Sequence, residues 1–167
     1  MPGRTVRFAA GWRAGPALAE RSDMGEGTFE RVSDTDRPLY GPRKVVFCGF
    51  PAKAQPAVEA LMAMVGLGAV PKLYLGAGHA DQRLAALVQL PDGTGGGIDS
   101  ELPRAIIVGG ITEKELQQLM AGARASQMQP PLWAVLTPVS ENWTLAALLR
   151  ELAAEREAMA RSTPPPG

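Results

Sequence analysis

The chain has 167 residues, which suits one domain, and 46% of them are apolar, enough to bury a core. Its 17 basic and 17 acidic residues cancel, so no charge surplus favours nucleic acid or a strongly charged partner. No apolar run approaches the roughly 20 residues that cross a bilayer, which argues against a membrane partner. The single cysteine, Cys48, cannot form an intrachain disulfide, and this favours an intracellular setting.

The first part of the chain has no sustained hydrophobic period, so we expect a disordered or targeting leader over residues 1–42. Arg4, Arg7 and Arg13 precede the first acidic residue, Glu20, which is the charge pattern of an organelle transit peptide. Serine, which such peptides usually contain, is missing before Glu20. A disordered arm without a targeting role is therefore the alternative.

A first repeat unit is predicted over residues 44–90. Its strands are continuous apolar runs, which indicates burial on both faces, as in a parallel sheet. Val58, Leu61 and Met62 fall on one side of its longer helix, and Pro56 is acceptable in the first turn. The predicted elements are a strand over 44–49, a helix over 55–65, a strand over 71–75 and a helix over 82–90 that Asp81 caps.

A second unit is predicted over residues 104–160, after a Gly-rich stretch, 91–103, which we expect to be a flexible linker or a long loop. Thr112 and Glu115 form a capping box, in which both side chains bind free amides at a helix start. The predicted elements are a strand over 104–109, a helix after Thr112, a strand over 132–136 and a helix over 143–160 that Asn142 caps. Residues 162–167 should form a disordered tail.

The two units repeat the same order of strand, turn, cap and helix. Residues 44–49 match 104–109, and further along the chain Asp81 aligns with Asn142, each before a shared Leu-Ala-Ala-Leu sequence. We call the spacing between Asp81 and Asn142 the repeat offset. We predict one α/β domain, residues 43–161, with two β-α-β-α units in one mainly parallel four-stranded sheet flanked by helices. Helices on both faces would give three layers with pseudo-twofold symmetry, and helices on one face would give two.

Candidate ligand-binding residues lie where strands end and helices begin. In a parallel α/β sheet this edge gathers free amides and positive helix ends, which hold anions. Glycines there are equally explained as turn residues, and neither turn contains a nucleotide-binding motif. The candidates for a ligand site are Gly49, Gly110, Thr112, Thr137, Ser140 and Asn142.

Trp133 and Trp143 are the candidate contacts for a protein partner, because tryptophan is a frequent anchor of interfaces. Trp143 is also explained as a side chain that fixes its helix against the sheet, beside the Asn142 cap. Cys48 near a strand end is a candidate for thiol redox chemistry, although a buried apolar role explains it better. His79 is the only histidine, so no histidine-rich or other metal site is expected.

The stretch TPVSENWTL at 137–145, followed by two leucines and Glu-Leu up to residue 152, resembles the bacterial and archaeal domain-of-unknown-function family 3783. Its members share this signature after a strand and a helix, and the resemblance covers about residues 104–156. The first unit departs from it, since Gln82 replaces the tryptophan and Gly76–His79 replaces the Thr-Pro turn. The two-unit arrangement with an arginine-bearing leader is similar to plant and algal plastid proteins of this group, which implies a plastid location, with the cytoplasm as alternative.

The resemblance implies no reaction, and no pair of nucleophile and base, metal cluster or phosphate loop is found in the sequence. We therefore expect an α/β interaction or regulatory module without catalytic residues or a cofactor, which binds a protein partner. The alternative is an enzyme that binds a small molecule or anion at the strand-end edge of the sheet. The oligomeric state is open, because an exposed edge strand can pair between copies.

Overall fold

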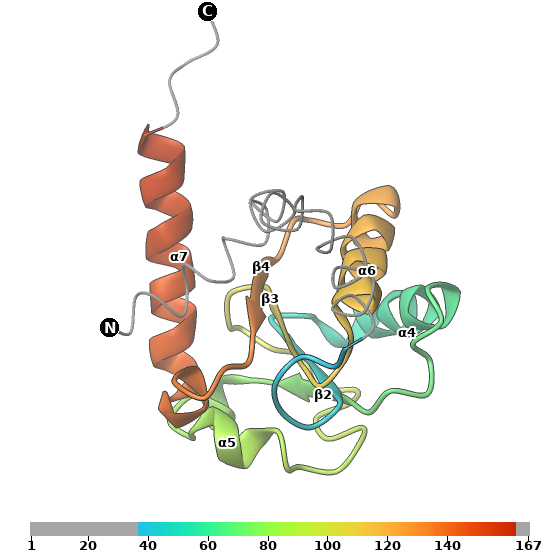
Figure 1. The fold of residues 1–167 in the computed structure, drawn as a ribbon, viewed down its shortest axis with the longest axis horizontal. Helices are drawn as coiled ribbons and strands as arrows, with labels where there is room; N and C mark the ends of the chain where they lie inside the picture. The colour runs from blue at the N-terminus through green and yellow to red at the C-terminus, as the bar shows by residue number, and fades with distance from the viewer. Residues whose placement is uncertain (1–36, 163–167) are drawn as a thin grey trace, which may run out of the picture.

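The computed structural model describes residues 37–162, in which four strands form one sheet with helices on both of its faces (Figure 1). The strands are β1 (Lys44–Cys48), β2 (Lys72–Leu75), β3 (Ala105–Gly109) and β4 (Leu132–Val135). The helices are α4 (Gln55–Met64), α5 (Leu84–Leu87), α6 (Glu113–Ala125) and α7 (Leu145–Ser162), with short 3-10 helices η1 (Ala52–Ala54), η2 (Ala77–His79) and η3 (Ser140–Asn142). The predicted leader lies mostly outside the described residues.

The sheet order is β2-β1-β3-β4, and the predicted fold class is confirmed. Each unit contributes a parallel pair, β1 with β2 and β3 with β4, as expected for strands joined through a helix. The central pair, β1 with β3, is antiparallel, with Lys44 opposite Gly109 and Cys48 opposite Ala105. The sheet is therefore mixed and mostly parallel, because the second unit is turned by half a rotation relative to the first.

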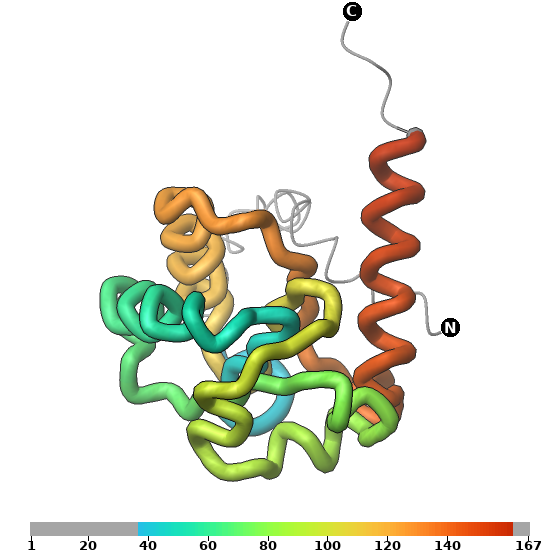
Figure 2. The backbone as a smooth tube through the Cα atoms, turned by 180° about the vertical axis from the view of Figure 1, so that it is seen from behind, coloured from blue at the N-terminus to red at the C-terminus, as the bar shows by residue number. Residues whose placement is uncertain are grey.

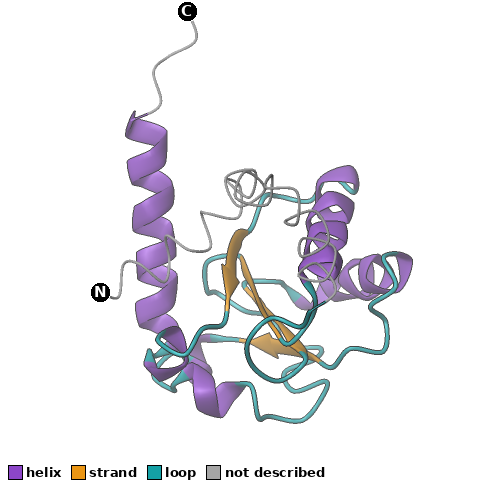
Figure 3. Cartoon of the chain, viewed as in Figure 1, coloured by secondary structure: helices purple, strands orange, loops and turns teal. Residues whose placement is uncertain are grey.

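The molecule has three layers, as the two-sided alternative predicted (Figures 1 and 3). Helices α4 and α6 cover one face, where a core cluster contains Val45, Phe47 and Ile106. Helices α5 and α7 cover the other face, where the second cluster contains Val46 and Ile107. Every residue of β3 is buried, which is why its sequence is apolar without alternation.

The faces also correct the alignment of the two strands. Val45 of β1 and Ile106 of β3 lie on the same face and are separated by the repeat offset. The match of 44–49 with 104–109 would instead align Val45 with Ala105, which lies on the opposite face. That match is therefore wrong by one residue, and Gly49 corresponds to Gly110. The repeat offset then relates the strands, the glycine turns that follow β1 and β3, and the starts of α5 and α7.

Two predicted helix caps are wrong, while their equivalence holds. Helix α5 begins at Leu84 without a side-chain cap, and α7 begins at Leu145, so Asp81 and Asn142 lie too early to cap them. The hydroxyl of Thr144 accepts a hydrogen bond from the amide of Ala147 at 3.1 Å, which makes Thr144 the cap of α7.

The two helix starts pair with each other across the pseudo-twofold axis. The amide of Leu84 donates to the carbonyl of Trp143 at 2.9 Å, and the amide of Leu145 donates to the carbonyl of Gln82 at 3.0 Å. These two bonds join equivalent positions, since the repeat offset takes Leu84 to Leu145 and Gln82 to Trp143. The repeated sequence at the start of α5 and α7 is thus a contact between the two units.

The Gly-rich stretch is an ordered loop that packs on the first unit, not a flexible linker between units. The buried side chain of Gln55 in α4 accepts a hydrogen bond from the amide of Gly97 at 2.7 Å and donates to the carbonyl of Ile98 at 3.2 Å. Figure 2 shows the loop from behind, lying close to the start of α4. Its glycines allow backbone to approach backbone, since a Cβ on Gly95 would overlap the carbonyl of Tyr74.

Candidate functional site

The antiparallel central pair separates the predicted ligand residues into two groups. The groups lie at the two opposite strand-end edges of the sheet, where the strands begin or finish. Gly49 follows β1, whose end lies beside the beginning of β3 at Ala105. Gly110 follows β3, whose end lies beside Lys44 at the beginning of β1. Thr112, Thr137 and Ser140 follow β3 and β4, which are parallel, so they lie at the edge of Gly110. No single site therefore contains both glycines.

The edge at Gly49 is occupied by the protein's own side chains. The carboxylate of Asp99 accepts a hydrogen bond from the amide of Ala52 at 2.7 Å, where η1 leads into α4. The hydroxyl of Ser100 accepts from the amide of Gly49 at 3.1 Å. An internal carboxylate thus fills the position where an external anion was predicted.

The edge at Gly110 is covered by the segment that precedes β1, which was assigned to the leader. The amide of Gly110 donates to the carbonyl of Tyr40 at 3.1 Å, and the amide of Leu39 donates to the carbonyl of Ile111 at 2.7 Å. Gly110 has a positive φ of 69°, and a Cβ there would lie 2.4 Å from the amide nitrogen of Arg43. The glycine is required by this close approach, and the domain includes residues 38–42.

The same contact occurs at the equivalent position of the first unit. Gly49 has a φ of 77°, and a Cβ there would lie 2.4 Å from the carbonyl oxygen of Leu102 and 2.7 Å from that of Pro103. The Pro-Arg pairs at 42–43 and 103–104 are equivalent, so each unit's leading segment crosses the strand-end edge of the other unit. We call residues 38–43 and 99–104 the crossing segments.

Thr112 is used in the predicted capping box, and that prediction is confirmed. Its hydroxyl accepts from the amide of Glu115 at 3.0 Å, and the Glu115 carboxylate accepts from the amide of Thr112 at 2.9 Å. The guanidinium of Arg43 also binds both oxygens of this carboxylate, at 2.7 and 2.8 Å. These hydrogen bonds, led by the one from Arg43, lower the pKa of Glu115 to about 2. The start of α6 therefore already has a negative charge beside it, which the carboxylate of Glu115 supplies.

Thr137 and Ser140 bind each other in the turn after β4. The amide of Thr137 donates to the Ser140 hydroxyl at 3.0 Å, and the amide of Ser140 donates to the Thr137 hydroxyl at 2.9 Å. Ser140 is 1% exposed, so its hydroxyl belongs to the interior of the turn. The amide group of Asn142 donates to the carbonyl of Pro138 at 3.3 Å. These side chains form the turn and do not converge on a ligand.

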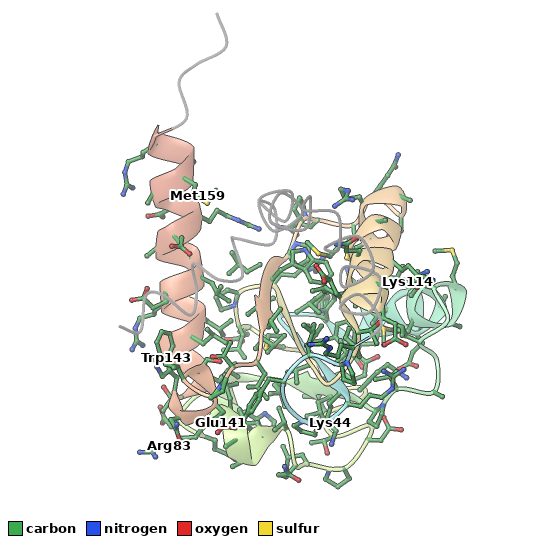
Figure 4. The ribbon with its side chains drawn as sticks, in the orientation of Figure 1. Lys44, Arg83, Lys114, Glu141, Trp143 and Met159 are labelled. Carbon is green, nitrogen blue, oxygen red and sulfur yellow. The ribbon has the colours of Figure 1, made fainter. Side chains whose placement is uncertain are left out.

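The two tryptophans lie on opposite faces of the sheet. Trp133 is half-buried on the α4/α6 face, and Trp143 is half-buried against the α5/α7 cluster. In Figure 4, Trp143 lies at the base of α7, in the region where Glu141 and Arg83 are also labelled. The carbonyl of Trp143 accepts the hydrogen bond that joins the two units, so the fold itself accounts for the position of this residue. Trp133 is on the edge strand β4.

Neither Cys48 nor His79 is arranged for chemistry. Cys48 is fully buried, and its burial raises the pKa of the thiol to about 12, which suppresses the reactive thiolate. The ring of His79 accepts a hydrogen bond from the amide of Gly76 at 3.2 Å, which fixes the turn. Among residues 37–162, no three His, Cys, Asp or Glu side chains are grouped to hold a metal ion.

Sequence reasoning missed the difference between the two outer edges of the sheet. At β2, the Lys72 amide donates to Asp92 at 2.8 Å, the Gly93 amide donates to the Lys72 carbonyl at 2.7 Å, and the Tyr74 amide donates to the Thr94 carbonyl at 2.8 Å. Residues 92–94 align with 153–155 of α7, so the second unit has no such loop. Alignment of the whole chain at the repeat offset could have predicted this difference.

As far as the structure describes the chain, the outer edge of β4 is consequently open. The amides of Leu132 and Leu136 donate to the β3 side, so the alternation of a strand directs the backbone groups of Trp133 and Val135 outward. Among the described residues, no partner binds the amide or carbonyl of Trp133 or the amide of Val135. The equivalent groups of β2, on Lys72 and Tyr74, are all bound. An open edge strand is a backbone feature that can bind another chain.

Comparison with known proteins identifies one match. Residues 104–159 match the family described as "Domain of unknown function (DUF3783)", which agrees with the resemblance of the second unit. No curated protein and no solved structure matches the chain significantly. In the part of the chain that the structure describes, no helix has both the length and the apolarity that a bilayer crossing requires.

Proposed function

We propose that this chain is a protein-interaction module whose second unit presents the interface, and that its partner adds a strand to β4. The observation that carries the proposal is the open row of backbone groups on Trp133 and Val135, in contrast to a β2 edge whose equivalent groups are all bound. Strand addition to an exposed sheet edge is a general mode of recognition, in which backbone hydrogen bonds supply affinity.

Trp133 supports the same edge as the contact surface. Its side chain is half-buried on the α4/α6 face, where the partly buried Met120 and Met128 pack on the same cluster. Aromatic and methionine side chains are enriched in interfaces, where they supply apolar area and adapt to a partner. Trp143 contributes less to this proposal, because it lies on the other face and joins the two units.

The alternative of an anion-binding enzyme loses its main support. Both strand-end edges carry crossing segments, and the amides of Gly49 and Gly110 bind Ser100 and the Tyr40 carbonyl. The carboxylates of Asp99 and Glu115 already occupy the starts of the helices behind these edges. An external anion would have to displace bonds that the fold itself makes.

The test is affinity capture with the full chain as bait, comparing Trp133→Lys with a control, Met64→Lys, which changes an apolar side chain that is 65% exposed on α4. We expect a stoichiometric partner on the wild type and on the control that is lost with Trp133→Lys, because lysine on an edge strand opposes pairing. A thermal melt of each bait checks that it is folded. The same partner on all three baits would contradict the proposal.

We also propose that the chain is a two-unit member of the plastid-type group and is imported. The support is the arginine-bearing leader together with the internal repeat. A fluorescent protein fused behind residues 1–42 should enter plastids, and replacing Arg4, Arg7 and Arg13 by glutamate should keep it in the cytoplasm. A fusion that stays in the cytoplasm without these changes would favour the cytoplasmic alternative.

A further inference from the structure

The open edge of β4 has a geometry that a second copy of the same strand can satisfy. Trp133 and Val135 both direct their backbone groups outward, with the inward-facing Ala134 between them. In an antiparallel pair centred on Ala134, the outward groups of Trp133 meet those of Val135 of the second copy. Each such residue pair exchanges two hydrogen bonds, so the strand is complementary to itself.

We infer that the partner at this edge is a second copy of the chain, joined through antiparallel β4 strands about a twofold axis at Ala134. The inference rests on the proposed function and names its partner. The resulting sheet would have eight strands and no uncovered β4 edge. The same kind of contact already joins the two units inside one chain, since β1 and β3 are equivalent strands paired antiparallel.

Bonds that the chain makes itself limit the open row of backbone groups to the length of β4. The Arg156 guanidinium donates to the carbonyl of Pro131, just before β4, at 2.8 Å. The amide of Glu141 donates to the carbonyl of Thr137, just after β4, at 3.0 Å. Antiparallel pairing places Pro131 of one copy opposite Thr137 of the second copy. A second β4 in this register therefore matches the open row from end to end, and neither of these two bonds has to break.

The whole chain also carries no charge that would oppose self-association, since its 17 basic and 17 acidic residues cancel. A strongly charged foreign peptide would find no opposite surplus. Because β4 has only four residues, the paired strands bury less area than a standard interface of about 1,600 Å². We therefore expect a dissociation constant of about 1–100 μM rather than a permanent dimer.

The first test is sedimentation of the full chain between about 1 μM and 1 mM, a range that brackets this affinity. The mass should rise from 17.6 kDa towards twice that value, and Trp133→Lys should remain monomeric while Met64→Lys dimerises. Val135→Pro, which removes an outward-facing amide, should also remain monomeric, since proline is accepted on an edge strand where its missing amide faces outward. Because Val135→Pro changes no bond to β3, it keeps the test valid if Trp133→Lys fails to fold.

A second test reports the register. Residues opposite each other without hydrogen bonds in an antiparallel pair have Cα atoms about 4.5 Å apart, a distance that a disulfide spans. Ala134→Cys should therefore form an intermolecular disulfide under mild oxidation, although Ala134 is only 4% exposed in the single chain. The control, Ala86→Cys on the exposed side of α5, should not cross-link under the same conditions.

Three results would overturn the inference. One is a mass that stays at 17.6 kDa throughout, and another is a dimer that Trp133→Lys, Val135→Pro and Ala134→Cys show to lie elsewhere. The third is protection of the Trp133 and Val135 amides from hydrogen exchange in the dilute monomer, which would assign the edge to residues 1–36. If the chain is monomeric and Trp133→Lys still loses a captured partner, the proposed function stands and only the second copy is excluded.

Discussion

The two units of this sheet are most alike where they touch each other and least alike at their outer edges. The crossing segments, the glycines they cover and the paired helix starts all recur at the repeat offset. The outer strands differ, because the backbone of β2 is bound by residues 92–94, whereas within residues 37–162 the outer edge of β4 is open. Contacts between repeats must match on both sides of a pseudo-twofold axis, whereas an outer edge can change alone.

The largest effect should come from the two equivalent glycines. Gly49→Ala and Gly110→Ala each place a Cβ 2.4 Å from backbone of a crossing segment, at a positive φ. We expect each to lower the free energy of unfolding by about 3 kcal/mol, because both strain and overlap must be relieved. Urea denaturation of each variant measures this loss.

Gly66→Ala is the control for this comparison, since Gly66 has a φ of 85° and nothing lies within 4 Å of the added carbon. It should cost only about 1 kcal/mol, which is the conformational strain alone. If Gly49→Ala and Gly110→Ala lose no more than the control, the crossing segments are not held as described. A large loss at only one of the two glycines would contradict their equivalence.

The second largest effect on stability should distinguish the arginines of the two equivalent Pro-Arg pairs, because they contact different chemical groups. Arg43 binds the carboxylate of Glu115, whereas the equivalent Arg104 lies over the ring of Phe50, 4.7 Å from its centroid. Because the pKa of Glu115 is lowered to about 2, its ionised form stabilises the fold above the unfolded pKa near 4.5, and this contribution is lost as pH falls towards 2. Glu115→Gln should cost about 1 kcal/mol at pH 7, discounted for the exposure of Arg43.

Denaturation of the wild type and Glu115→Gln at several pH values tests the direction in which this stabilisation changes with pH. The difference between them should be constant from pH 7 to about 5 and should shrink below about 4.5. Replacing the neutral partner of Arg104, by Phe50→Leu, should give a loss that does not depend on pH in this range. A difference for Glu115→Gln that grows as pH falls would refute the assignment.

The smallest effect concerns the helix caps. Thr144→Ala should lower stability by about 1 kcal/mol, because it removes the acceptor for the Ala147 amide. Asn142→Ala should cost less than about 0.5 kcal/mol, since the one described hydrogen bond of its side chain is to the Pro138 carbonyl at 3.3 Å on an exposed surface. Arg83→Thr, at the position equivalent to Thr144, should stabilise α5 slightly. Thermal melts of the three variants rank the positions, and a larger loss for Asn142→Ala would restore it as the cap.

Sequence patterns predicted the strands, the longer helices, the capping box at Thr112 and the internal repeat, because all of these depend on local hydrophobic period and side-chain chemistry. They did not predict the antiparallel centre, since an apolar strand such as β3 pairs equally well in either direction. That direction decides the candidate site: it places Gly49 and Gly110 at opposite edges. The role of Asp99 was also hidden, because its partner Ala52 is far away in the sequence and has no recognisable motif.

The central antiparallel pair has a consequence for the order of synthesis. When β1 and β2 leave the ribosome, the inner edge of β1 has no strand beside it until β3 is made, after α4, β2, α5 and the Gly-rich loop. At roughly 5–20 residues per second, that delay is several seconds. During this time the nascent first unit carries an apolar sheet edge that its own loop does not cover. Chaperone binding to ribosome-bound chains should therefore peak before residue 109 emerges and then fall.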